Sequence, residues 1–92
     1  MSTQPVTGTF TATANSAAIE INRGYFNISI SGTFSSSVQL QRSFDAGTIW
    51  LDVGSPYTAG AEAVIHEPEA GVQYRFSNTW TSGTSVIYRI SQ

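Results

Sequence analysis

The sequence contains no cysteine and no lysine, and it has few charged residues of either sign. Without cysteine, the chain has no disulfides, no thiolate metal ligands and no cysteine nucleophile. Its four arginines are scattered, so they do not form the basic patch that binds nucleic-acid phosphates. No apolar run approaches the roughly 20 residues that span a bilayer, and the first residues lack the cationic and apolar regions of a signal peptide. The sequence therefore indicates no nucleic-acid partner and no membrane partner, and it predicts a chain used without export.

Charged residues make up only 11% of the 92 residues, against the roughly 25% usual in globular domains. The good helix formers leucine, lysine and methionine are rare or absent, whereas valine, isoleucine, threonine and aromatic residues, which suit a pleated surface, are common. A chain of this length holds one hydrophobic core. We therefore predict a single all-β domain over residues 1–92, with residues 1–7 as a candidate flexible N-terminal arm.

Apolar and polar residues alternate along several segments bounded by turn-forming residues, which is typical of half-buried strands. We expect Tyr25–Ser31 to be a central strand, because its alternation is the most regular. Residues 32–37 are expected to form a loop or a strand break, and residues 82–84 a hairpin turn. The predicted strands are Gly8–Ala14, Ala17–Ile21, Tyr25–Ser31, Val38–Phe44, Ile49–Val53, Ala61–His66, Val72–Trp80 and Val86–Ile90.

Seven or eight short strands at intervals of about ten residues predict an antiparallel two-sheet β-sandwich. Two topologies stay open at this point, an immunoglobulin-like sandwich and a jelly roll. The segment from Glu67 to Tyr74 is similar to the corner of immunoglobulin-like domains, in which a tyrosine at the start of a late strand bonds back to the preceding loop. In the strand Val38–Phe44, the alternation places Phe44 on the same face as Val38 and Leu40.

Residues 43–50 read SFDAGTIW and fit the pattern S-x-D-x-G-x-x-W, the Asp-box of sialidases and other β-proteins. In such a turn we expect the Asp45 carboxylate to accept hydrogen bonds from backbone N–H groups, Gly47 to take a positive φ, and Trp50 to pack over the loop. The chain is far too short for the many blades of a sialidase propeller. We interpret Ser43, Asp45, Gly47 and Trp50 as a structural turn.

His66 stands beside Glu67, with Glu69 two residues further on, and this is where a histidine meets carboxylates in the sequence. A metal site would need a second histidine or a denser set of carboxylates. Acid–base catalysis would need paired carboxylates in a cleft, and the sequence has no G-x-S-x-G serine motif. We therefore predict a solvated, proline-containing corner, with no catalytic residues, no metal and no cofactor.

Four aromatic residues, Tyr25, Trp50, Tyr57 and Trp80, are candidates for stacking on sugar rings. The turn already accounts for Trp50, and Trp80 continues the alternation of a core face. Tyr57 and Trp80 are the candidate ligand-stacking residues of an alternative function, a carbohydrate-binding module.

The lack of lysine also bears on the edges of the predicted sheets. Open sheets usually guard their edges with lysine, inward-pointing charge or proline. The segments Gly8–Ala14 and Ser85–Ile90 carry one charged residue between them, Arg89. If either segment lies at the edge of a sheet, we expect a neighbouring subunit to cover it.

Two parts of the sequence resemble a group of small structural proteins of tailed bacteriophages. They are residues 26–53, FNISISGTFSSSVQLQRSFDAGTIWLDV, and residues 69–92, EAGVQYRFSNTWTSGTSVIYRISQ. The most specific part is LQRSFDAGTIW, residues 40–50, and residues 1–25 contain no matching motif.

The resemblance implies a virion component without enzymatic activity, such as a head-decoration, cement or fibre-base protein. On this basis we expect homo-oligomers, dimers or trimers, that bridge neighbouring major capsid subunits or other virion proteins. The protein would be made in the bacterial host cytoplasm and reside in the virion. The alternative is a carbohydrate- or receptor-binding module of a phage tail or fibre. A domain with few charges suits a symmetric lattice, where repetition strengthens modest contacts.

Overall fold

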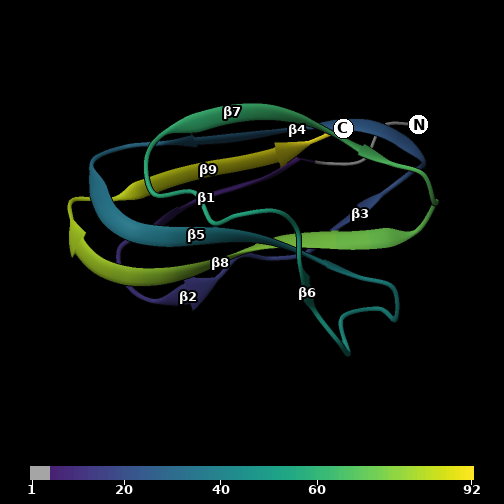
Figure 1. Ribbon diagram of the computed structural model, residues 1–92, viewed down its shortest axis with the longest axis horizontal. Helices are drawn as coiled ribbons and strands as arrows, with labels where there is room; N and C mark the ends of the chain where they lie inside the picture. Colours follow the sequence, from purple (N-terminus) through teal and green to yellow (C-terminus); the bar gives the residue numbers. More distant parts are fainter. Residues whose placement is uncertain (1–4) are drawn as a thin grey trace.

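The structure is a computed structural model that describes residues 5–92. These residues contain no helix, and two antiparallel sheets of four and five strands pack face to face (Figure 1). The predicted all-β, two-sheet sandwich is therefore confirmed. The strands are β1 (Val6–Phe10), β2 (Ala14–Asn15), β3 (Ile19–Ile21), β4 (Gly24–Ser31), β5 (Phe34–Ser43), β6 (Leu51–Asp52), β7 (Ala61–Glu67), β8 (Val72–Gly83) and β9 (Val86–Ser91).

The strand order distinguishes between the two topologies that the sequence left open. One sheet has the order β1-β9-β4-β7, and the other has the order β2-β8-β5-β6, with β3 also paired to β8. If β2 and β3 are counted as one interrupted strand, each sheet has four strands. With that count, the first described strand lies beside the last, and β5 and β6 are the only consecutive pair among the described strands that belongs to one sheet. This order is that of a jelly roll, because an immunoglobulin-like sandwich pairs its first two strands within one sheet.

Alternate residues of the strands point between the two sheets and form the hydrophobic core. Burying an isoleucine, valine, leucine or phenylalanine side chain contributes roughly 1.5–3 kcal/mol relative to leaving it exposed, so these residues hold the sheets together. β4 lies between β9 and β7, as expected for the central strand. The core residues are Phe10, Ile19, Ile21, Phe26, Ile28, Ile30, Val38, Leu40, Val72, Tyr74, Phe76, Val86 and Ile90.

Side-chain oxygens replace backbone partners of β8 where β2 and β3 are interrupted. The Ser16 N–H donates to the Phe76 carbonyl at 2.8 Å, and the Phe76 N–H donates to the Ser16 hydroxyl at 2.9 Å. Further along β8, the Trp80 N–H donates to Thr13 Oγ1 at 3.0 Å. The backbone groups of this edge of β8 are therefore satisfied although the paired strand is discontinuous.

Two predicted segments near strand ends were wrong. Residues 8–14 do not form one strand, because β1 ends at Phe10 and Ala14 pairs with Asn78 in the other sheet. Residues 32–37 are mostly strand, because β5 begins at Phe34 and stays paired with β8 through a register shift between Ser35 and Ser36. Nine strands form in the described chain instead of seven or eight, because the predicted segment 8–14 contributes both β1 and part of the two-residue strand β2. The predicted strand Ile49–Val53 was too long, because only Leu51–Asp52 forms a strand, β6.

The predicted hairpin turn at residues 82–84 was also wrong, because β8 and β9 belong to different sheets. β8 continues to Gly83, and the N–H groups of Thr84 and Ser85 donate to the Thr33 carbonyl at 2.8 and 3.2 Å. Gly83 has a φ of 126°, and a Cβ there would lie 2.5 Å from the Phe34 Cα. Only glycine fits this crossing between the sheets.

The candidate N-terminal arm of residues 1–7 includes part of a strand. Val6 and Thr7 belong to β1 and pair with Ile90 and Arg89 of β9. Residues 1–4 of the predicted arm lie outside the described residues.

Candidate interaction surface

Residues 44–50 join β5 to β6 as a hairpin loop that extends beyond the two sheets (Figure 1). The buried Ser43 hydroxyl accepts hydrogen bonds from the N–H groups of Gly47, at 2.8 Å, and Asp45, at 3.3 Å. It donates its own proton to Asp45 Oδ1 at 2.7 Å, and the same carboxylate oxygen accepts from the Ile49 N–H at 2.9 Å. Two side chains thus hold the loop closed from within.

The loop backbone turns through two residues with positive φ, Ala46 at 58° and Gly47 at 91°. The Trp50 ring lies against Gly47, since a Cβ on Gly47 would be 3.5 Å from Trp50 Cζ2. The hydrogen bond from the Ile49 N–H, followed by the one from the Ser43 hydroxyl, lowers the pKa of the Asp45 carboxyl from its ordinary 3.8. Asp45 therefore carries its charge at neutral pH, where the charge strengthens these bonds.

A second set of contacts fixes the base of the hairpin to the five-stranded sheet. The Arg75 guanidinium lies over the Trp50 ring, 4.3 Å from its centroid. Arg75 Nε donates to Gln41 Oε1 at 3.0 Å, and Gln41 Nε2 donates to Asp52 Oδ1 at 3.0 Å. The side chains of β8, β5 and β6 are thus connected in one chain of contacts.

Three large apolar side chains of this hairpin remain in solvent. The exposed fraction is 52% for Phe44, 59% for Ile49 and 45% for Leu51. The sequence pattern did not indicate this group, because the alternation placed Phe44 with the core residues of β5, whereas β5 ends at Ser43. The predicted turn itself could have indicated that Phe44 is exposed, since a strand cannot continue into a loop that Ser43 and Asp45 close. We call Phe44, Ile49 and Leu51 the hairpin patch.

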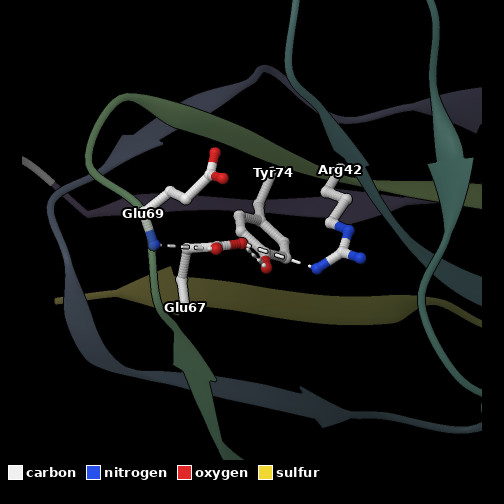
Figure 2. Close-up of polar contacts among 4 residues, drawn as sticks. All are labelled: Arg42, Glu67, Glu69 and Tyr74. Carbon is white, nitrogen blue, oxygen red and sulfur yellow. Dashed lines mark hydrogen bonds and ion pairs between the residues drawn. The ribbon is translucent and has the colours of Figure 1, made fainter.

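A buried polar cluster lies between the sheets near the base of the hairpin (Figure 2). Tyr74, from the five-stranded sheet, donates its hydroxyl proton to Glu67 Oε1 at 2.6 Å across the sandwich. Glu67 Oε2 accepts from the Glu69 N–H at 3.1 Å, and Arg42 Nη1 lies 3.6 Å from Glu67 Oε1. Arg42 also lies over the Phe44 ring, 5.0 Å from its centroid. The cluster connects the two sheets to the first residue of the hairpin loop.

Burial shapes the chemistry of this cluster. Desolvation, and then the hydrogen bond to Glu67, raise the pKa of Tyr74 to about 12. Tyr74 is therefore a proton donor across the whole physiological range, and the carboxylate of Glu67 is its acceptor. Both oxygens of the buried Glu67 side chain thus have partners, and removing either Glu67 or Tyr74 would leave a buried polar group unsatisfied.

The predicted solvated corner was wrong for Glu67, which is only 1% exposed. It holds for His66 and Glu69, which are exposed, and the Glu69 side chain points away from the cluster (Figure 2). The alternation of β7 places Glu67 on the same inward face as Ala63 and Ile65, and the Tyr74 hydroxyl donates a hydrogen bond to it. The resemblance to a tyrosine corner was therefore the signal that could have identified Glu67.

The other predicted site residues are spread over the molecule. Tyr57 and Trp80 are half-buried and pack against the hydrophobic core, and Tyr57 also forms an isolated bridge with Val38 of β5. Tyr25 is 69% exposed on the outer face of the four-stranded sheet, with its ring centroid 4.8 Å from that of His66. Among residues 5–92, no group of three or more histidine or acidic side chains could hold a metal ion.

Two adjoining hollows of about 610 and 450 Å³ lie on that same outer face. Both are lined by Ser29 and Arg89, and the larger one also by Asn27 and Glu62. Ser29 pairs with Glu62 on one side and with Arg89 on the other, so the three residues form a row across β7, β4 and β9. This face therefore offers hydroxyl, amide, carboxylate and guanidinium groups to a ligand.

A scan against protein-family models, a search of curated proteins and a search of solved structures return no match to this chain. Over the described residues, the structure has no helix of the length and apolarity needed to cross a membrane.

Proposed function

We propose that the protein is a non-enzymatic structural component of a bacteriophage virion that clamps neighbouring major capsid subunits, as a decoration or cement protein does. The carrying observation is the hairpin patch, in which a loop closed by Ser43 and Asp45, together with β6, holds three large apolar side chains in solvent. In this proposal the chain is made in the bacterial host cytoplasm and functions in the virion as a homo-oligomer.

The rigidity of the hairpin supports this role. A loop that is already ordered loses little conformational entropy on binding, so more of the contact energy appears as affinity. Completing the burial of a half-exposed isoleucine, leucine or phenylalanine contributes about 1 kcal/mol each. One hairpin would therefore bind weakly, and many copies on a symmetric shell would bind together strongly.

The fold and the resemblance support the same class of protein. Jelly rolls recur in viral capsid proteins, although a fold by itself does not define a function. The most specific part of the phage resemblance, residues 40–50, contains the turn that presents Phe44 and Ile49. The most specific part of the resemblance thus includes the loop that hydrogen bonds fix and that solvent surrounds.

Mass spectrometry of purified particles of the phage that encodes this chain tests the proposal directly. We expect the polypeptide in intact particles, and its absence from them would end the proposal. Particles that lack the protein can then be incubated with purified wild type or with the Ile49→Ser variant. We expect the wild type to rebind and Ile49→Ser to rebind about fivefold more weakly per contact, given about 1 kcal/mol for the lost side chain.

Val64→Ser is the matched control for this experiment, because Val64 is exposed to a similar degree, at 64%, on the outer face of the other sheet. It should rebind like the wild type. Equal rebinding of all three proteins would show that the hairpin patch does not contact the particle.

The outer face of the four-stranded sheet favours a second candidate function, a carbohydrate- or receptor-binding module of a tail or fibre. Tyr25 is exposed beside His66, and the two adjoining hollows supply polar groups of the kinds that bind sugar hydroxyls. Glycan-array binding that disappears in Tyr25→Ala would favour this function. Loss of binding in Trp80→Ala or Tyr57→Ala would instead favour the platform predicted from the sequence.

A further inference from the structure

β1 is an edge strand without the usual protection against pairing with another chain. Among residues 5–92, only β9 pairs with β1, so its other side has free backbone N–H and C=O groups. The edge strand β7 carries Glu62 and His66, β3 carries Glu20, and β6 carries Asp52. β1 reads VTGTF, with neither charge nor proline. The four-stranded sheet is therefore guarded at one edge and open at the other.

β1 is held firmly along its inner side. The Phe10 side chain is buried, and its ring centroid lies 4.5 Å from that of Tyr88. The Tyr88 ring also fills the space beside Gly8, where a Cβ would lie 2.4 Å from the tyrosine hydroxyl oxygen. A larger residue at position 8 would displace the Tyr88 ring, so the packing of Tyr88 favours glycine there.

The side chains of β1 are arranged symmetrically about Gly8. From Val6 to Phe10 the strand reads VTGTF, in which an apolar residue stands at each end and a threonine on each side of Gly8. We propose that β1 pairs with β1 of a second copy, antiparallel and related by a two-fold axis at Gly8. In that register Thr7 lies opposite Thr9 of the second copy, and Val6 lies opposite its Phe10. Such pairs of threonines and of apolar residues are favourable across antiparallel strands.

This pairing would join the two four-stranded sheets into one continuous eight-stranded sheet. Five facing residues supply about four to six backbone hydrogen bonds between the copies. A seam of this size is small for a stable dimer, so we expect weak association that becomes effective when many copies are held on one surface. The inference names the contact behind the self-association in the proposed function, and it does not involve the hairpin patch.

Sedimentation across a range of concentrations tests the pairing through charges at positions 7 and 9. In the double variant Thr7→Lys/Thr9→Lys, every Thr7–Thr9 contact becomes a pair of like charges. In Thr7→Lys/Thr9→Glu, both contacts become pairs of opposite charge, but only in the register centred on Gly8. We expect the first variant to raise the dimer dissociation constant about tenfold or more and the second to stay close to the wild type.

Cysteine cross-linking tests the register independently, because the natural chain has no cysteine. Directly opposed residues in antiparallel strands lie within the Cα separation that a disulfide allows. Thr7→Cys and Thr9→Cys, mixed and oxidised, should form a cross-linked heterodimer. Either variant alone should cross-link far less, because identical positions are offset by two residues, about 7 Å, along the seam, which takes their Cα atoms beyond the separation that a disulfide allows.

Three results would overturn the pairing. They are a wild type that stays monomeric at millimolar concentration, a dimer that persists in Thr7→Lys/Thr9→Lys, and equal cross-linking of the mixture and of the single cysteine variants. Circular dichroism and thermal unfolding of each variant exclude loss of the fold as the cause. None of these results affects the particle-binding test of Ile49→Ser, so the two proposals can fail separately.

Discussion

Glu67 and Asp45 use the same device in two very different places. Each carboxylate accepts a hydrogen bond from a backbone N–H group and another from a side-chain hydroxyl. Glu67 lies between the sheets with Tyr74 and Arg42, whereas Asp45 is exposed in the hairpin loop. Similar hydrogen bonds therefore stabilise the whole fold when the carboxylate is buried, and only one loop when it is exposed to water.

The largest expected effect comes from removing the buried carboxylate. Glu67→Ala leaves the Tyr74 hydroxyl and the Glu69 N–H without their acceptor and opens space in the interior. We expect a loss of about 3 kcal/mol in the free energy of unfolding, measured by urea denaturation. Glu69→Ala is the control, because its exposed side chain takes no part in the cluster, and it should stay within about 0.5 kcal/mol of the wild type. Equal stabilities would contradict the structural role of Glu67.

Tyr74→Phe should have the next largest effect, because it removes one strong hydrogen bond and leaves Glu67 with its other partners. We expect a loss of about 2 kcal/mol at neutral pH in the same denaturation measurement. Tyr25→Phe, which changes an exposed ring, should have little effect.

The raised pKa of Tyr74 also predicts a pH dependence. The unfolded chain loses this proton near pH 10, whereas the folded protein keeps it until about pH 12. The folded state therefore holds more protons in that window, and the free energy of unfolding should fall as the pH rises from about 10 to about 12. The contribution is fully present below pH 10. Tyr74→Phe should show a shallower fall than Tyr25→Phe, and identical slopes would contradict the prediction.

Asp45→Ala should have a smaller and local effect. It removes the acceptor of the Ile49 N–H and of the Ser43 hydroxyl, so amide hydrogen exchange should accelerate at Ile49 and Gly47 and stay unchanged in β8. Because the pKa of Asp45 is lowered, its contribution is present above about pH 4 and is lost as the pH falls through the lowered pKa. Glu62→Ala is the control, and faster exchange throughout the sandwich would contradict the division between loop and core.

Ile49→Ser should have the smallest effect on stability, within about 0.5 kcal/mol, since Ile49 is mostly exposed. The same variant is expected to impair rebinding to particles. A large destabilisation would mean that Ile49 serves the fold, and it would remove the hairpin patch as a candidate contact surface.

The strand pattern could be predicted well from the sequence, because burial on one face imposes a period of two. Phe26, Ile28 and Ile30 were placed together on one face of a central strand, and all three lie in the core of β4. The errors fall where the chain changes sheets or bends. The alternation continues past Phe10 although β1 ends there, and it stops near Gly83, where the chain crosses to the other sheet. In neither place does it indicate which sheet the next strand joins.

Only part of the candidate interaction surface could be predicted from the sequence. Ser43, Asp45, Gly47 and Trp50 are close in sequence, so their grouping in one turn could be expected from local chemistry. The contact of Trp50 with Arg75 joins distant segments of the chain. No local pattern contains it.

The sequence by itself determined an all-β chain, its approximate strands, and the lack of charge in residues 8–14, because composition and alternation act over a few residues at a time. Only the tertiary structure decided the jelly-roll order, the burial of Glu67 against Tyr74, and the exposure of Phe44. These features depend on which distant strands become neighbours. That choice is set by closing the two sheets over one common core, and inward and outward residues look alike in either sheet.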